Sequence, residues 1–483
     1  MSPLLDLAAV ALLVVATAVV GFAGLRFSRT TSDFFVASRS VRPVWNASAI
    51  SGEYLSAGTF LGLAGLVLLS GAEGFWFPIG YAAGYLLVLL FVAAPLRRSG
   101  AYTIPDFVQA RLESRGARYI TSIVVLVIGW LYIVPQLHGA ALTLGVVADL
   151  PPWTGAVLVA VLVAGIVAAG GMRAITAVQA MQYWLKLTAL AVPAILILMA
   201  LSGGETSFEP SQVFPAERGP SGADAYGTTS LMIALLLGTI GLPHVLVRFY
   251  TSPDGGSARR TTVLVIGMVG LFYAVSGTMG LIARVVAPDL AVPGVADTVV
   301  LALPSRVFPG PVGDVLTALI VAGAFAAFLA TSSGLVVSLA GVVSQDLFGG
   351  TVRSFRFSAV LCTLVPLAVA LVTVPEGLVS SVGNVFVFAA SSLTPVLILG
   401  VWWRGLTARG AVAGMLVGAL GCGTAFVLAP LVGEGFVHEL LAQPAAWTIP
   451  LATTAVVVVS LLDRASIPAR VDRYFARLHL PEP

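Results

Sequence analysis

Charged side chains are scarce in this chain: Asp, Glu, Lys and Arg make up only 10% of its 483 residues. Soluble globular domains carry roughly 25%, so the composition excludes a water-soluble protein of this length. Hydrophobic residues reach 58% and the mean hydropathy is +1.00. The bilayer is therefore the expected solvent. Because an open sheet edge cannot satisfy its backbone in lipid, we predict an all-α, polytopic membrane protein.

Residues that carry metal or redox chemistry are also few. The two cysteines, Cys362 and Cys422, lie inside apolar segments and are interpreted as small buried hydrophobes. The four histidines are scattered without metal-ligand spacing, and the chain has no glycine-rich phosphate loop and no nucleophile motif in a suitable context. We therefore predict no catalytic residue, and we keep a membrane-embedded enzyme only as a rival class.

What the chain does contain is a series of long apolar runs. Each is long enough, or nearly so, to cross the hydrocarbon as a helix. The thirteen segments are approximately 4–25, 44–70, 74–96, 119–150, 153–170, 175–201, 230–246, 262–286, 315–343, 357–374, 378–403, 411–431 and 445–462. The first is interpreted as a retained helix, because a secretory signal would be shorter and would carry a basic residue before it.

The arginines alternate between loops. They gather in every second connection, beginning with the four arginines at 26, 29, 39 and 42 and ending in the stretch 464–477, while the other connections are mainly acidic. By the positive-inside rule we expect an inner-membrane protein with its N-terminus outside and its C-terminus in the cytosol. The net charge of +3 follows from this pattern, so it does not indicate nucleic-acid binding. We expect residues 463–483 to form a cytosolic tail.

Two apolar segments are interrupted near their middle. The second contains Gly52-Glu53-Tyr54-Leu55-Ser56, and the seventh contains Gly241-Leu242-Pro243-His244. Paired breaks of this kind are typical of the midplane sites of inverted-repeat transporters, where freed carbonyls face a cation and freed N–H groups face an anion. The alternative is that these glycines only let helices pack closely.

Four stretches resemble the solute:sodium symporter family, and the nearest branch is its cation/acetate and monocarboxylate permeases. They are 32–39 (Ser-Asp-Phe-Phe-Val-Ala-Ser-Arg), 52–56, 241–250 (Gly-Leu-Pro-His-Val-Leu-Val-Arg-Phe-Tyr) and 403–410 (Trp-Arg-Gly-Leu-Thr-Ala-Arg-Gly). The resemblance covers nearly the whole chain. It implies one transmembrane domain of the five-plus-five inverted-repeat fold, with repeats at 44–201 and 230–403, an extra helix at 4–25 and two extra helices within 411–462.

The resemblance also implies a sodium site made of backbone carbonyls and hydroxyls. Its residues here are Gly52, Leu55, Ala327, Thr331 and Ser332. Oxygen ligands suit a hard cation, and no other metal is expected. Many relatives carry two adjacent hydroxyls; the first position here is Ala330, so Ser332 or Ser333 has to compensate. Thr176 stands where some relatives have an aspartate for a second ion, which favours one sodium.

Two ionisable residues, Glu53 and Lys186, lie inside predicted spans, where neither is tolerated facing lipid. One interpretation of Lys186 is a structural partner for a carboxylate; the other is a coupling amine that replaces or competes with the cation. The residues predicted to contact the solute are Glu53, Tyr54, Ser56, Gln136, Thr239 and Gly241. Polar residues at such positions can equally be hydrogen bonds between helices.

The resemblance implies sodium-driven uptake of a small organic solute, a monocarboxylate such as acetate, by alternating access. A proton-coupled carrier that uses Lys186 is the alternative within transport, and a channel-like facilitator is the alternative outside coupling. The expected partners are the solute, Na+ (or H+) as coupling ion, and the bilayer.

Overall fold

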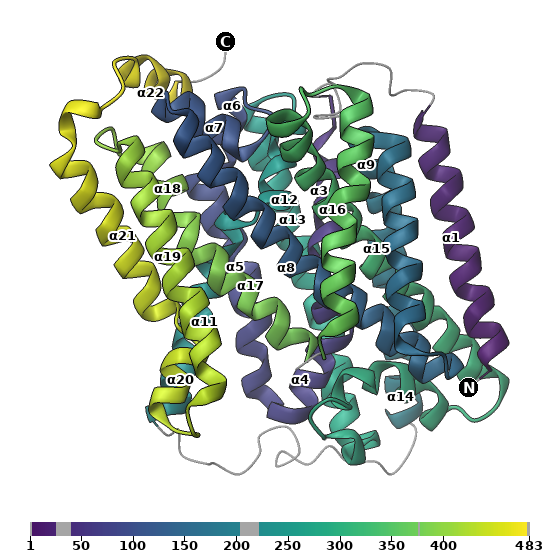
Figure 1. The fold of residues 1–483 in the computed structure, drawn as a ribbon. Helices are drawn as coiled ribbons and strands as arrows, with labels where there is room; N and C mark the ends of the chain where they lie inside the picture. The colour runs from purple at the N-terminus through teal and green to yellow at the C-terminus, as the bar shows by residue number, and fades with distance from the viewer. Residues whose placement is uncertain (1, 26–39, 203–221, 375–376, 481–483) are drawn as a thin grey trace.

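The computed structural model describes residues 2–25, 40–202, 222–374 and 377–480 and is helical nearly throughout (Figure 1). The stretch 32–39, and residues 203–221 of the connection between the sixth and seventh predicted segments, lie outside the described residues. The helices of the first half are α1 (Pro3–Leu25), α3 (Pro43–Tyr54), α4 (Leu63–Ser70), α5 (Trp76–Phe91), α6 (Ala93–Ser99), α7 (Ile104–Leu112), α8 (Arg115–Ala148) and α9 (Pro152–Ser202). Those of the second half are α11 (Gly222–Gly241), α12 (Pro243–Val247), α13 (Gly255–Val286), α14 (Val299–Val307), α15 (Pro311–Leu347), α16 (Val352–Val372), α17 (Leu378–Ser392), α18 (Thr394–Trp402), α19 (Ala408–Leu428), α20 (Phe436–Ala442), α21 (Ala445–Leu462) and α22 (Val471–His479).

Within these described ranges, nine helices are long and apolar enough to span a membrane, or eleven if each of two bent pairs counts as one span. Two of the nine contain a turn, and we interpret each of them as part of two crossings. Helix α9 has 51 residues and kinks at Gly171, where φ is 60°; a straight helix of that length would measure about 77 Å, more than twice the hydrocarbon thickness. The unit Gly58–Phe91 likewise turns at Gly71, where φ is 60°. Counting both as two gives the thirteen crossings predicted from the apolar runs.

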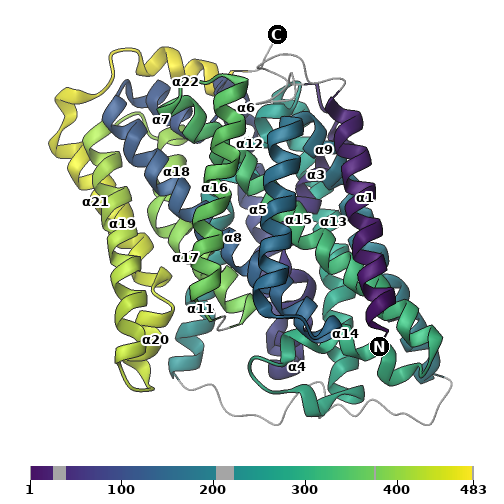
Figure 2. The same cartoon turned by 45° about the vertical axis from the view of Figure 1, so that its right-hand side comes forward.

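The centre of the bundle is formed by α3, α8, α9 and α15. Helix α15 packs against α9, α8 and α3, and nearly all its residues from Leu316 to Ser344 are buried. Gly52 lets α3 approach α9, because a Cβ atom there would overlap the backbone carbonyl of Gln179. Helix α1 lies at one side against α9 and α15, and α19 and α21 form a pair at the other side (Figure 2).

Three spans are interrupted. Helix α3 ends at Tyr54, and a short π-helix at Gly58–Gly62 precedes α4. Helices α11 and α12 meet at Leu242, which is extended, and are bent by 41°. Both breaks were predicted from the sequence. The third, also of 41°, separates α17 from α18 before Pro395.

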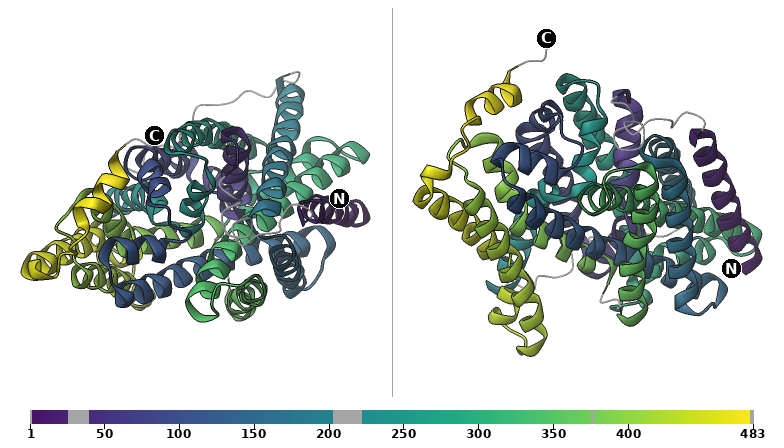
Figure 3. Two further views of the ribbon diagram at one scale, coloured as in Figure 1. Left: turned by 90° about the horizontal axis from the view of Figure 1, so that it is seen from above. Right: turned by 45° about the horizontal axis from the view of Figure 1, so that its top comes forward.

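The segment expected to be a tail is folded. Helix α22 buries Phe475 and Leu478 and packs against α6, so it lies across the ends of the spans on the face opposite α20 (Figures 1 and 3). A search for long apolar runs does not detect it, because α22 has only nine residues and most are polar or charged.

Candidate functional site

Lys186 occupies the break in α3. It is the only lysine of the chain, and its side chain is fully buried. Its Nζ donates to the carbonyl oxygen of Gly52 and, at 2.8 Å, to that of Leu55. These are the two carbonyls that the family resemblance assigns to sodium. The amine on α9 thus holds the freed carbonyls of α3 in the manner of a tethered cation.

The residues predicted on α15 lie beside the same break. Thr331 Oγ1 donates to the carbonyl oxygen of Glu53 at 2.6 Å. Ser332 Oγ is buried and makes no hydrogen bond of normal geometry to a described residue. Ala327 is fully buried one helical turn before Thr331. The structure therefore brings α3, α9 and α15 together at the predicted cation site.

Glu53 forms a buried ion pair with Arg248. The Arg248 Nε to Glu53 Oε2 distance is 2.7 Å, and the two side chains are 1% and 3% exposed. Arg248 also donates to Thr176 Oγ1 at 2.8 Å and to Gln179 Oε1. Gln179 in turn donates to the carbonyl oxygen of Ala330 at 2.7 Å. This network joins α3, α9, α15 and the segment after α12, and it was missed because Arg248 was interpreted as one of the loop arginines.

Further residues meet between the broken helices, and we call them the polar cluster: Ser56, Tyr81, Tyr85, Tyr132, His244 and Tyr273. All are buried, and apart from weak interactions of Tyr132 with Ser56 and Tyr81, their hydroxyl or ring-nitrogen atoms make no hydrogen bond to a described residue. The rings are neighbours, with centroids 5.1 Å apart for Tyr132 and His244 and 6.1 Å apart for Tyr81 and Tyr273. Phe386 of α17 packs at 4.4 Å on Tyr81.

Only Ser56 of this cluster was predicted from the sequence. The tyrosines lie inside apolar helices, where an aromatic residue is normally interpreted as packing. The available signal was the spacing of Tyr81 and Tyr85, which puts two hydroxyls on one face of α5.

Four other predicted solute contacts lie at the same place but already have partners or serve packing. Tyr54 Oη is 3.2 Å from Thr239 Oγ1, and Thr239 donates to the carbonyl oxygen of Leu235. Gln136 Oε1 accepts from the Ala57 N–H at 2.8 Å. Gly241 lies at the α11–α12 break against the backbone of α17, which a Cβ atom would contact at 2.6 Å.

The centre thus contains three ionisable side chains, those of Glu53, Lys186 and Arg248, and several neutral hydrogen-bond donors, all of them buried. Broken helices around a buried polar centre are how inverted-repeat carriers hold a solute and an ion at mid-membrane, so the fold and site define an ion-coupled membrane carrier. The chain belongs to the sodium:solute symporter family, whose model matches residues 34–418.

Two curated proteins match over most of their length. The Monocarboxylic acid transporter of Corynebacterium glutamicum is 29% identical over 503 aligned residues, which cover 95% of this chain and 90% of that protein. The uncharacterized symporter YwcA of Bacillus subtilis is 32% identical, with 86% of this chain and 85% of that protein covered.

Solved structures support the fold. A Na+-coupled sialic acid symporter, in a substrate-bound outward-open state, matches with a TM-score of 0.75 at 18% identity and covers 95% of this chain and 97% of its own. The nucleobase-cation-symport-1 transporter MHP1 matches with a TM-score of 0.56 at 13% identity and covers 92% and 98%. At these identities the likeness concerns architecture, and it agrees with the five-plus-five inverted-repeat fold.

Proposed function

We propose that this protein is a symporter that takes up a small monocarboxylate, such as acetate, by alternating access. The observation that carries the proposal is the polar cluster. Within the cluster Tyr132 interacts with Ser56 and Tyr81, but buried phenol, hydroxyl and imidazole groups with so few hydrogen bonds are costly in a bundle core. A solute that accepts hydrogen bonds from them reduces that cost. A carboxylate has two acceptor oxygens, and the surrounding aromatic rings suit a short hydrocarbon chain.

The buried charges favour a monoanion. Glu53 and Arg248 neutralise each other, so neither is left to pair with a solute. Lys186 has carbonyl oxygens and no carboxylate as hydrogen-bond partners. With all three groups charged, the centre carries one uncompensated positive charge, which a single carboxylate balances. A dicarboxylate or an amino acid would bring a second charged group, for which the centre without a bound ion has no partner.

For the coupling ion we propose Na+ at Gly52, Leu55, Ala327, Thr331 and Ser332. Membership of the sodium:solute symporter family supports this choice, and so does the convergence of oxygen atoms at the break. In a transport cycle coupled to Na+, the ion displaces the amine of Lys186 from the carbonyl oxygens of Gly52 and Leu55. One Na+ that crosses with one monocarboxylate carries no net charge, so the inward Na+ concentration gradient, and not the membrane potential, drives the uptake of the solute.

One observation favours a second candidate, a proton-coupled carrier. The ammonium of Lys186 already satisfies the carbonyls of Gly52 and Leu55. In that cycle the proton on Lys186 takes the place of Na+, and its release loosens the break in α3. Solute specificity is the same in both cycles.

Uptake into proteoliposomes tests both proposals. Labelled acetate, propionate and pyruvate are offered under an imposed Na+ gradient, an imposed H+ gradient, or neither. We expect all three to be taken up and to compete with one another, and succinate and alanine to compete poorly. Failure of all three monocarboxylates to compete would exclude the proposed solute class. Accelerated counterflow exchange identifies a carrier, whereas a channel-like facilitator would show none.

The variant Lys186→Met distinguishes Na+ coupling from H+ coupling. For Na+ coupling, the variant retains uptake that requires Na+, since the displaced amine is no longer needed. For H+ coupling, uptake loses its response to the pH gradient or stops. Arg353→Gln, an exposed substitution on α16, is the control for expression and reconstitution.

A further inference from the structure

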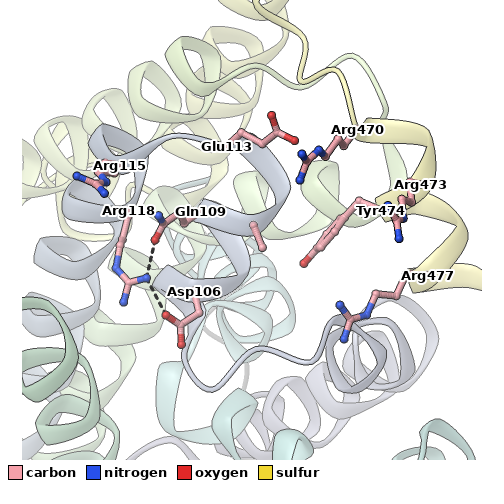
Figure 4. Close-up of a pocket in the computed structure, with 10 residues that line it drawn as sticks. Asp106, Gln109, Glu113, Arg115, Arg118, Arg470, Arg473, Tyr474 and Arg477 are labelled. Carbon is pink, nitrogen blue, oxygen red and sulfur yellow. Dashed lines mark hydrogen bonds and ion pairs between the residues drawn. The ribbon is translucent and has the colours of Figure 1, made fainter. Parts of the chain in front are cut away.

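A concave surface lies at the end of the bundle that carries α22, far from the breaks in α3 and α11–α12. It has a volume of about 840 Å³ and is formed by α7, the start of α8, and α22 with the residue before it (Figure 4). Its lining residues are Asp106, Gln109, Ala110, Glu113, Arg115, Arg118, Arg470, Arg473, Tyr474 and Arg477. We call this the arginine pocket.

Only one arginine of the pocket is neutralised by its neighbours. Arg118 pairs with Asp106 at 2.8 Å and with Asp346 at 2.6 Å. The side chains of Arg115, Arg470 and Arg473 make no hydrogen bond or ion pair with any residue in the described part of the chain. Five arginines thus face three carboxylates, counting Asp346 with the lining acids. The pocket keeps a net positive charge.

Tyr474 adds a neutral donor. Its hydroxyl points into the pocket between the arginines (Figure 4), is buried, and has the side chain of Ser99 as its polar neighbour. Burial raises the pKa of Tyr474 to about 12. The phenol therefore keeps its proton at physiological pH and can donate it to an acceptor.

The arginines of α22 are held in position rather than free on a tail. Phe475 is buried, with the guanidinium groups of Arg111 and Arg404 at 5.0 and 5.5 Å from its ring centroid. Arg111 is itself fixed by hydrogen bonds to the carbonyl oxygens of Gly400 and Trp403, both at 2.9 Å. These contacts fix the backbone of α22, and the side chain of Arg477 is held as well, because its Nε donates to the carbonyl oxygen of Arg98 at 3.0 Å. An anion therefore meets arginines on a docked helix and not on a free tail.

We propose that the arginine pocket binds a phosphate group, either that of an acidic phospholipid headgroup or that of a soluble phosphate compound. Guanidinium groups match phosphate oxygens with paired, charge-assisted hydrogen bonds, and basic pockets at the ends of transmembrane helices are suited to acidic headgroups. Two of the arginines stand in the first turn of α8, the helix that carries Tyr132 and Gln136 at the solute site. Bound phosphate thus fixes the helix end from which the solute site is built.

Thermal unfolding of the full-length protein in a neutral detergent tests this proposal. One probe is dioctanoyl phosphatidylglycerol, with dioctanoyl phosphatidylcholine as its uncharged-headgroup reference; the other is inorganic phosphate, with chloride at equal ionic strength as reference. The variants are Arg470→Gln/Arg473→Gln and Tyr474→Phe. The matched control is Arg353→Gln/Arg356→Gln, which removes two exposed charges of α16 outside the pocket.

We expect phosphatidylglycerol, inorganic phosphate or both to raise the unfolding temperature of the parent and of the control. The double pocket variant should need a probe concentration higher by about tenfold or more, since each lost charge-assisted bond accounts for about that factor. A response to phosphatidylglycerol alone identifies a lipid site, and a response to inorganic phosphate identifies a soluble ligand. Equal responses of parent and pocket variants, an equal loss in the control, or no response to either probe would overturn the proposal. Should the double variant not fold, Tyr474→Phe, which removes one donor, carries the same comparison.

Discussion

Glu53 shows how closely single residues are fitted at the centre of the bundle. Its carboxylate lies against α15 at Gly334, where a Cβ atom would collide with it. Its Oε2 is held by Arg248, while Oε1 has no hydrogen bond of normal geometry. The pair is inaccessible to water, so each charge depends on the other.

Removal of the positive charge of Arg248 should therefore lower the stability of the protein strongly. Arg248→Met leaves Glu53 as an unpaired buried carboxylate, and we expect a loss of about 3–5 kcal/mol of stability. The reciprocal change Glu53→Gln should cost less, since Arg248 keeps Thr176 and Gln179 as acceptors. Unfolding temperatures in detergent, with Arg353→Met as the exposed control, measure both. Equal stability of Arg248→Met and parent would contradict the buried pair.

Thr331 gives a test of the cation site that changes little volume. Thr331→Ala removes the hydroxyl that donates to the carbonyl of Glu53, with a stability cost of about 1 kcal/mol. It should also raise the Na+ concentration needed for half-maximal uptake. Thr331→Ser keeps the hydroxyl and should resemble the parent in both measurements. If Na+ dependence is identical in all three proteins, Thr331 is not a ligand.

For single residues, the sequence was informative where a charged side chain lies inside an apolar segment. Glu53 and Lys186 were predicted because a charge in an apolar run needs an explanation. The position of Lys186 at Gly52 and Leu55 followed only from the packing of α9 on α3. Arg248 and Tyr132 were missed, because an arginine at a segment end and a tyrosine in an apolar helix are ordinary in membrane proteins.

At the scale of helices, the break in α3 is stabilised from α8. Gln136 Oε1 accepts from the freed N–H of Ala57, and Gln136 Nε2 donates to the carbonyl of Tyr132 at 3.3 Å. Thr59 and Phe60 resume backbone bonding to Ser56. Gln136 was predicted as a solute contact; in this structure it supplies the acceptor that the broken helix lacks.

Gln136→Leu should therefore affect stability as well as transport. The change strands the buried N–H of Ala57, at a cost of about 1–3 kcal/mol. Gln136→Glu keeps an acceptor oxygen and should recover most of the unfolding temperature, although it adds a charge near the solute site. Solute KM and unfolding temperature are measured for both. A normal unfolding temperature with a raised KM in Gln136→Leu would instead assign the side chain to the solute.

The long apolar runs predicted the transmembrane helices well and the ends of those helices less well. Apolar runs located every long helix, and glycine and proline located the breaks in α3 and α11–α12. The third break, at Ser392–Thr394, also has a proline beside it, Pro395, but this signal was not used in the prediction. Helix α22 had no such signal, because it has nine residues and most are polar or charged.

For the whole molecule, the distribution of charge predicts which face meets the cytosol. The end that carries α22 holds the arginine pocket together with Arg353, Arg404 and Arg409, whereas the end that carries α20 holds Glu434 and Glu439 (Figure 1). Because arginine-rich loops stay inside, we propose that α22 is cytosolic and the start of α1 is outside.

Cysteine labelling decides this orientation. Cys362 and Cys422 are buried, so the parent should react little with a membrane-impermeant maleimide. Glu434→Cys, at an exposed site before α20, should be labelled in intact cells; Arg473→Cys, exposed on α22, should be labelled only after the membrane is permeabilised. The reverse pattern would place the arginine pocket outside and separate it from the acidic lipids of the inner leaflet. Label on both variants in intact cells would contradict α21 as a transmembrane helix, since it is the one long apolar helix between the two labelled sites.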